Sequence, residues 1–419
     1  MDKDTLYDVV IVGGGPAGMM AAGTAAESGA RVVLIEKNGT LGKKLLITGG
    51  GRCNVTNAEF DTRKLLSKFK ENSKFLFSAF SDWSVRDTLD FFHDKNMPTK
   101  VENELRVFPV SDSAQSVWDV LVDNMKRLNV EILSNSPVTE IIREEDRIVG
   151  VRLKNKKVIL GKSIIIATGG TSRPETGSTG DGYKWLRDIG HTVSEPTASL
   201  VPIALKDKWA KSMAGTTLRD IKLSLWQNDV LQDKVAGKIL FTHVGISGPT
   251  VLNMSRDVGE LLKYGPVKIT LDLLPRFNYG ELNLELQKVF SANATKKFKN
   301  SLGSLITGAM TDTIVELSGI SGDKTCNSIS RGDRLALVQL LKAVPMHVDR
   351  LLGLDKAVIS SGGVLLTEVD MKTMQSRTFP NLFLVGDILN IDRPSGGYSL
   401  QLCWTTGHVA GKNAVKNLL

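Results

Sequence analysis

Between residues 7 and 37 the chain passes through an apolar segment, a glycine-rich turn, a helix-forming segment and a second apolar segment ending in an acid. The apolar segments YDVVIV (7–12) and RVVLIEK (31–37) are short and β-branched, which is typical of parallel strands buried on both faces. The turn GGGPAG (13–18) satisfies the pattern G-x-G-x-x-G, and the small residues after it predict a helix closed by Gly29. Together these elements predict a β-α-β unit of a doubly wound sheet.

Each key residue of this unit has a task in binding a dinucleotide. Gly13 allows a tight turn, Gly15 allows the backbone to approach a pyrophosphate, and Gly18 allows the helix to pack on the sheet. The helix N-terminus supplies free N–H groups and a positive dipole end for the phosphates. Glu36 follows at about the spacing where an acid accepts hydrogen bonds from ribose hydroxyls. The unit therefore predicts a site for the ADP half of NAD or FAD, without choosing between them.

Two further strand ends decide between these cofactors. RIVGVRL (147–153) and VILGKSIIIATGG (158–170) predict a hairpin that leads into a buried strand ending in Ala-Thr-Gly-Gly. LFLVGD (382–387) predicts another strand, and its ending resembles the late motif of flavoproteins with dinucleotide-binding domains, which implies that Asp387 accepts a ribityl hydroxyl. Residues 396–415 then predict a glycine-opened helix, whose dipole would favour an anionic reduced flavin. Three such motifs in this order are similar to those of FAD-containing flavoproteins, and they predict FAD.

Composition limits the alternatives. With 419 residues, 42% hydrophobic and 23% charged, the chain is long enough for two or three soluble domains. The formal net charge is +8, but the densest basic runs, at 154–157 and 296–299, are short, so we favour a solvated surface and expect no nucleic-acid partner. Three cysteines without metal-type spacing argue against a metal site and for a reducing compartment. Because no signal-like segment or apolar run of about 20 residues occurs, we expect a cytoplasmic protein without a membrane partner.

Several short motifs are similar to those of one bacterial family. They are GKKLLITGGGRCNVTN (42–57), TGSTGDGY (176–183), SLVPI (199–203), ILFTHVGISGP (239–249), SGGV (361–364) and SGGYSLQ (395–401). Through them the chain resembles the NAD(P)/FAD-dependent oxidoreductases that include proposed 3-dehydro-bile acid delta-4,6-reductases and aminoacetone oxidases. The resemblance covers nearly the whole chain.

The resemblance implies an α/β fold, with a Rossmann-like (doubly wound) FAD-binding domain and an inserted domain made of a β-barrel and helices. The FAD-binding domain would comprise residues 1–194 and 356–419. The insert would comprise residues 195–355, close over the flavin and shape the substrate pocket. Helical periodicity at 280–290 and 334–344 fits the helical part of the insert.

The resemblance also places residues 48–57 along the cofactor, where the glycines would let the backbone pass close to it and Arg52 and Asn54 would donate hydrogen bonds. Taking the fingerprint, the strand ends and the resemblance together, we expect FAD to be bound by Gly13, Gly15, Ala17, Gly18, Glu36, Lys37, Gly50, Arg52, Cys53, Asn54, Val138, Thr168, Gly169, Gly386, Asp387, Gly397, Tyr398, Ser399 and Leu400.

Five positions depart from the family's pattern. Arg173 stands in place of an aromatic residue, Leu105 and Arg393 in place of glycines, Asn390 in place of an acid and Ser399 in place of an asparagine. We expect FAD binding to survive these changes. They leave the substrate open, because the loop at 388–397 is expected to border the flavin.

Four residues are candidates for the chemistry, and each has a plainer alternative. Cys53 follows an arginine that could lower its pKa, but a small packing residue is the interpretation we favour. His243 could orient a substrate carbonyl or move a proton, or it could be structural. Arg52 could bind an anionic group or form an ion pair, and Tyr398 could donate a proton or anchor the core.

The sequence favours an NAD(P)H-driven reductase that passes hydride from the flavin to an activated C=C of a small hydrophobic enone. No second G-x-G-x-x-G follows a strand, so NADH or NADPH would dock transiently in the substrate cleft. The alternatives are an aminoketone oxidase that uses O2 and, less favoured, an RNA-associated flavoprotein. The sequence does not decide the substrate, the nicotinamide or the oligomeric state.

Overall fold

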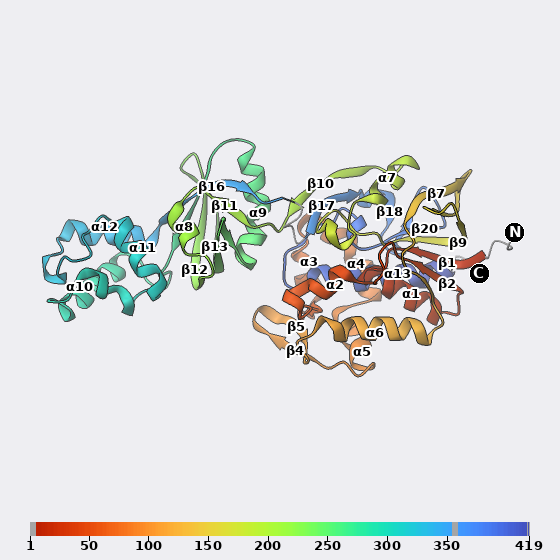
Figure 1. Cartoon of the computed structure of the whole chain (residues 1–419), viewed down its shortest axis with the longest axis horizontal. Coiled ribbons are helices and arrows are strands. Elements are labelled where there is room, and N and C mark those ends of the chain that lie inside the picture. The colour runs from red at the N-terminus through yellow and green to blue at the C-terminus, as the bar shows by residue number, and fades with distance from the viewer. Residues whose placement is uncertain (1–5, 354–358, 417, 419) are drawn as a thin grey trace. The chain divides into compact units, whose positions relative to one another are not determined.

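The computed structural model describes residues 6–353, 359–416 and 418, and the chain divides into two compact units (Figure 1). Unit 1 consists of Met1–Ser199 and Leu354–Leu419, and unit 2 consists of Leu200–Gly353. Both ends of the chain therefore belong to unit 1, and unit 2 is an insertion within it.

A nine-stranded sheet forms the centre of unit 1, with the strand order β18-β19-β20-β9-β1-β2-β6 and a β7–β8 hairpin attached to β9. Strand β1 pairs in parallel with both β2 and β9, and β20 pairs in parallel with β9. The middle of β1 is fully buried, which explains its continuous apolar sequence. The strands are β1 Leu6–Val12, β2 Val32–Ile35, β6 Glu131–Leu133, β7 Val138–Glu144, β8 Arg147–Leu153, β9 Val158–Ile166, β18 Val369–Asp370, β19 Gln375–Ser376 and β20 Leu382–Leu384.

Helix α1 (Pro16–Glu27) packs closely against α13 (Tyr398–Lys416), so the first helix of the chain contacts the last. Two glycines of α13 make this possible. A Cβ on Gly407 would lie 2.4 Å from the carbonyl oxygen of Ala17, and one on Gly411 would lie 2.5 Å from that of Ala21. The close packing of α13 on α1 therefore joins the C-terminal segment to the N-terminal part of unit 1.

Further elements surround this core of unit 1. The helices are α2 Lys43–Ile47, α3 Thr62–Ser67, α4 Ser73–Asp82, α5 Val85–His93, α6 Ala114–Arg127 and α7 Asp181–Asp188. A small sheet contains β3 Thr56–Asn57, β4 Thr99–Glu102 and β5 Arg106–Pro109, and a second sheet pairs β10 Val193–Ser199 with β17 Ile359–Val364.

Unit 2 is a closed six-stranded barrel with helices inserted between its strands, and it has a hydrophobic core of its own. Along β12, buried and less buried residues alternate, as expected for a strand with one face in a barrel core. The barrel strands are β11 Ile203–Leu205, β12 Thr217–Gln227, β13 Val230–Thr242, β14 Gly245–Ser247, β15 Val267–Asp272 and β16 Val344–Leu351. The helices are α8 Lys208–Ser212, α9 Pro249–Leu262, α10 Tyr279–Ala292, α11 Gly308–Ser318 and α12 Arg331–Lys342.

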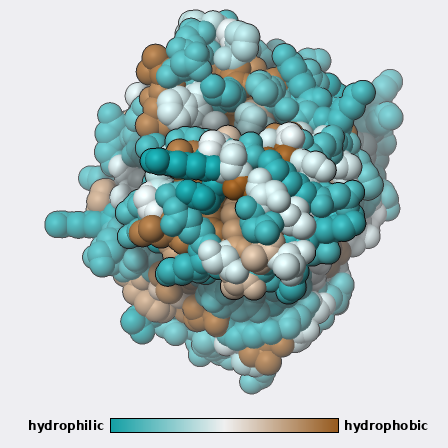
Figure 2. All heavy atoms as spheres, turned by 90° about the vertical axis from the view of Figure 1, so that its left-hand side faces the viewer, coloured by the Kyte–Doolittle hydropathy of each residue, from teal (hydrophilic) through white to brown (hydrophobic). Residues whose placement is uncertain are grey.

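Hydrophilic side chains cover most of the face that Figure 2 presents, where α10, α11 and α12 lie toward the viewer, and apolar groups are scattered among them. Within the described ranges of the chain, no helix is long and apolar enough to cross a bilayer. The predicted fold class, a doubly wound sheet with an inserted barrel and helical part, is confirmed. The helices predicted at 280–290 and 334–344 are present as α10 and α12, although α12 ends two residues earlier, at Lys342.

Candidate active site

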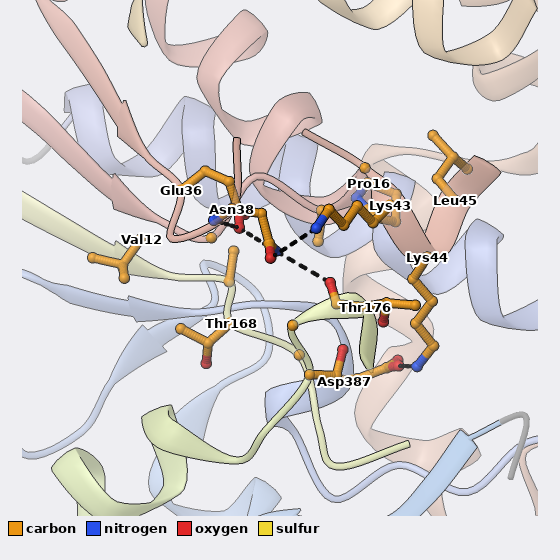
Figure 3. Close-up of a pocket in the computed structure, with 18 of the residues that line it drawn as sticks. Val12, Pro16, Glu36, Asn38, Lys43, Lys44, Leu45, Thr168, Thr176 and Asp387 are labelled. Atoms are coloured by element: carbon orange, nitrogen blue, oxygen red, sulfur yellow. Dashed lines mark hydrogen bonds and ion pairs between the residues drawn. The ribbon is translucent and has the colours of Figure 1, made fainter. Parts of the chain in front are cut away.

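A pocket in unit 1 lies at the carboxyl ends of β1, β2, β9 and β20 (Figure 3). It holds about 1220 Å³ free of protein atoms, including the part open to solvent. Open α/β sheets bind their ligands at this edge, because strand ends and helix N-termini meet there. Residues from both ends of the chain line it, from Val12 to Cys403.

The turn between β1 and α1 forms one wall of the pocket. Gly13 has φ +110°, and a Cβ there would lie 2.4 Å from the carbonyl oxygen of Ala167. A Cβ on Gly18 would lie 1.9 Å from the carbonyl oxygen of Gly13. A Cβ on Gly15, by contrast, would meet no described atom within 4 Å, so the space beside it is open. Helix α1 begins directly after it with Pro16, whose missing N–H costs nothing at this position.

Glu36 holds this turn as well as lining the pocket. Its Oε2 accepts a hydrogen bond from the backbone N–H of Gly14 at 2.8 Å. Its Oε1 accepts from the backbone N–H and the side-chain amide of Asn38, at 2.8 and 2.7 Å. A carboxylate can accept about four hydrogen bonds, so roughly one position remains for a ligand hydroxyl.

Lysines and amides continue the wall beyond Glu36. Helix α2 begins at Lys43, whose Nζ donates to Asn38 Oδ1 at 3.2 Å. Lys37 forms an ion pair with Asp181 at 2.7 Å. Lys43 and Lys44 bring positive charge to the pocket, as an anionic ligand requires.

The loop after β9 supplies an unpaired polar atom. The Oγ1 atom of Thr168 is buried and has no hydrogen-bond partner among the described residues, although Thr168 lines the pocket. A buried hydroxyl without a partner is costly, so a ligand that bonds to it would be stabilised.

Asp387 also lines the pocket and lies in the 3₁₀ turn Gly386–Ile388 that follows β20. Its Oδ1 accepts a short hydrogen bond from Arg393, and its Oδ2 lies 3.6 Å from Lys44 Nζ. Burial alone would raise the pKa of Asp387, but Arg393 and Lys44 outweigh burial and hold the pKa below its usual range. Asp387 is therefore an ionised acceptor in the pocket wall.

The structure separates the expected cofactor residues into two groups. Those that line the pocket are Gly13, Gly15, Ala17, Glu36, Lys37, Val138, Thr168, Gly169, Asp387, Ser399 and Leu400. Those expected at the cofactor but outside this lining are Gly18, Gly50, Arg52, Cys53, Asn54, Gly386, Gly397 and Tyr398. Lining residues that we did not expect include Asn38, Lys43, Lys44, Ser178, Asp181 and Cys403. Lys43 and Lys44 belong to the motif GKKLLITGGGRCNVTN (42–57), but the motif did not indicate that their side chains face the pocket.

The glycine-rich segment 48–57 supports the pocket more than it lines it, and among its residues only Thr48 belongs to the lining. Gly49, Gly50 and Gly51 all have positive φ, so the run of glycines is required by the backbone. The side-chain amide of Asn54 is oriented so that both its nitrogen and its oxygen have partners. The nitrogen donates to the carbonyl oxygen of Thr56 at 3.0 Å, and the oxygen accepts from the backbone N–H of Gly397 at 2.9 Å. This bond fixes the segment to the start of α13.

Arg52 and Cys53 are occupied by protein contacts. Arg52 pairs with Glu102 and Asp112 and stacks over Phe108. Cys53 is completely buried, and burial raises the pKa of its thiol to about 12, so the thiol is protonated at neutral pH. These contacts support the ion-pair and packing interpretations of the two residues.

Tyr398 and His243 lie in different units. Tyr398 is 8% exposed, packs edge-on against Phe69 and has its pKa raised by burial. His243 is exposed on the turn between β13 and β14 in unit 2. Of the four candidates for chemistry, His243 and Arg52 have accessible side chains, and Arg52 is engaged in its ion pairs.

These residues fit FAD. The open space at Gly15 and the N-terminus of α1 suit the pyrophosphate, Glu36 has acceptor capacity for a ribose, and Asp387 is ionised for a ribityl hydroxyl. The unpartnered hydroxyl of Thr168 and the cationic side chains of Lys43 and Lys44 match the polar and anionic parts of such a cofactor.

The HI0933-like protein Rossmann domain matches residues 7–413 of the chain. The chain belongs to this family. Among the similar proteins, the 3-dehydro-bile acid delta(4,6)-reductase of Clostridium scindens is 29% identical over 413 residues, covering 97% of this chain and 98% of the relative. The ribosomal RNA dihydrouridine synthase of Escherichia coli is 28% identical over 415 residues, covering 98% of each chain.

Solved structures of similar fold extend the comparison. A 3-ketosteroid delta1-dehydrogenase from Sterolibacterium denitrificans has a TM-score of 0.55 at 13% identity, covering 98% of this chain and all of that one. A flavocytochrome c3 fumarate reductase has a TM-score of 0.52 at 16% identity, covering all of this chain and 79% of that one. The predicted resemblance to a flavoprotein family and the predicted class, a flavin-dependent oxidoreductase, are both confirmed.

Proposed function

We propose that this member of the HI0933-like family is an NAD(P)H-driven flavoenzyme that reduces a C=C bond conjugated to a carbonyl group. The observation that carries the proposal is the pair of near-full-length relatives. One is named for reducing delta(4,6) bonds of a 3-dehydro-bile acid, and the other for making dihydrouridine. The name of the first relative implies hydride addition to a dienone. The name of the second implies hydride addition to the C5=C6 bond of uracil, which is conjugated to C4=O.

The residues of unit 1 suit this chemistry. Bound FAD would accept hydride from the nicotinamide and pass it to the electron-poor carbon of the substrate. Glu36 and the α1 turn would anchor the ADP half, while Asp387, held by Arg393 and Lys44, would orient the ribityl end.

For the substrate we favour a small enone, and one observation supports a second candidate, uridine within RNA. The basic excess is concentrated in unit 2, which has 20 Lys and Arg against 14 Asp and Glu, whereas unit 1 has 33 against 31. A basic unit attached to a flavin-binding unit would suit a polyanionic substrate. This is the RNA-associated alternative, with its chemistry now specified as reduction of uracil.

Two anaerobic mixing experiments test the proposal. The yellow protein is first mixed with NADH or NADPH, and the flavin absorbance is expected to bleach within the time of one turnover. The reduced protein is then mixed with a 3-oxo-4-ene steroid or with an unmodified ribosomal RNA transcript, and the absorbance is expected to return with one of them. If the rate at which RNA reoxidises the flavin falls steeply as salt is added, the RNA is bound electrostatically. Bleaching by an aminoketone, with none by either nicotinamide, would replace the proposal with the oxidase alternative.

A further inference from the structure

Arg393 is buried behind the pocket wall, and all its described hydrogen bonds go to residues of this region. The side chain is 1% exposed. Its Nη2 donates to Asp387 Oδ1, its Nη1 donates to the carbonyl oxygen of Ile391 at 2.6 Å, and its Nε donates to Ser399 Oγ at 3.0 Å. One buried guanidinium therefore connects the turn after β20 with the first turn of α13.

Both residues that it connects line the pocket, although Arg393 itself does not. Asp387 and Ser399 are 12 positions apart in sequence and belong to separate elements, so a shared donor fixes their relative positions. Arg393 therefore supports the pocket wall without forming part of its surface.

The cluster also carries a net charge. Lys44 Nζ lies 3.6 Å from Asp387 Oδ2 and donates to Ser172 Oγ. Asp387 is ionised, so two cations face one anion, and the cluster of Arg393, Lys44 and Asp387 has a charge of +1. A charge in a partly buried wall acts over a longer distance than one on the surface, because water screens it less.

We propose that Arg393 is a positioning residue that holds Asp387 and Ser399 and, with Lys44, raises the reduction potential of the bound flavin. A flavin gains electrons on reduction, so a positive wall stabilises the reduced form relative to the oxidised form. The dipole of α13, whose first turn contains Ser399, acts in the same direction. This inference rests on FAD binding, as part of the proposed function, and is independent of the nicotinamide and the substrate.

The test is a measurement of the midpoint potential of the purified holoprotein, by chemical reduction in the presence of reference dyes and without nicotinamide or substrate. Arg393→Gln is expected to lower the equilibrium constant for two-electron reduction by about tenfold, which corresponds to about 30 mV. Arg393→Lys keeps the charge and is expected to restore most of the potential. Arg187→Gln is the matched control, because Arg187 forms its ion pair with the exposed Glu195 outside the pocket lining.

Lys44→Gln provides a second measurement if Arg393→Gln fails to retain FAD, since it removes one cation and leaves the three bonds of Arg393 intact. The midpoint potential of the flavin in Lys44→Gln is also expected to fall. Equal potentials in the wild type, Arg393→Gln and Lys44→Gln would overturn the proposal. Equal losses in Arg393→Gln and Arg393→Lys, with Lys44→Gln unchanged, would overturn the charge effect. Failure of nicotinamide to bleach the flavin would instead count against the proposed function and leave this result unaffected.

Discussion

Replacing Glu36 tests whether one carboxylate both shapes the pocket and binds the cofactor. In Glu36→Ala, the backbone N–H groups of Gly14 and Asn38 lose their acceptor. An unsatisfied buried donor costs about 1–3 kcal/mol, so the two together cost about 2–6 kcal/mol, with the lower end applying if water from the pocket replaces the carboxylate. We therefore expect the protein without FAD to be destabilised, in addition to binding FAD more weakly.

The Gln variant separates charge from hydrogen bonding. A glutamine keeps one acceptor oxygen, which can accept either from the N–H of Gly14 or from the two donors of Asn38. Its NH2 group then faces the remaining donors and cannot accept from them. Its destabilisation should lie between that of the wild type and that of Glu36→Ala. Glu27→Gln is the matched control, because Glu27 is exposed at the end of α1.

The assay is urea unfolding of the protein without FAD, together with FAD binding followed by flavin fluorescence. With a slope of about 3 kcal/mol per M, a loss of 2 kcal/mol lowers the midpoint by about 0.7 M. An unfolding midpoint for Glu36→Ala equal to that of Glu27→Gln would refute the structural role, even if FAD binding weakened. Unchanged FAD affinity would refute the assignment of Glu36 to the ribose.

Three further predictions follow from the described contacts. Cys53 should resist alkylation at pH 8 in the folded protein, because a pKa of about 12 leaves roughly one thiolate in ten thousand; rapid labelling seen by peptide mass spectrometry would contradict its buried, protonated state. Gly407→Ala should destabilise the protein by about 1–3 kcal/mol in urea unfolding, since the new Cβ would lie 2.4 Å from a carbonyl oxygen of α1, and a neutral effect would mean that the helices separate freely. His408 is half-buried and stacked on Trp83, and desolvation lowers its pKa to about 4, so the unfolded chain binds a proton below pH 6.5 that the folded chain does not. Stability should therefore fall by about 2–3 kcal/mol as the pH drops from 6.5 to 4, and His408→Gln should lose that dependence; an unchanged pH profile would contradict the assignment.

The sequence could predict the elements whose local pattern is strong. The β1-α1-β2 unit, the strand ending before Asp387 and the two helices of the insert all carry a periodicity or a glycine pattern that needs no tertiary information. Such patterns also located Glu36 and Asp387 at the pocket, because strand ends gather at one edge of a parallel sheet.

What the sequence could not predict are the partners of each charged group. Arg52 looked available for an anionic ligand, yet Glu102 and Asp112, far away in sequence, engage it. Lys44 lines the pocket because Gly42, with φ +64°, begins α2 there, and the motif itself did not show this orientation. Long-range pairing of this kind depends on the packed structure, and single-sequence patterns do not record it.

The assembly of unit 1 from both ends of the chain has a consequence for biosynthesis. At roughly 5–20 residues per second, Asp387 leaves the ribosome about 20–70 s after Glu36. Until then β9 lacks its neighbour β20, and α1 lacks the helix whose glycines fit against it. All of unit 2 has been synthesised by that time and can fold first around its own core. Tight retention of flavin therefore reports that translation has passed α13, and a product terminated before Asp387 would remain colourless.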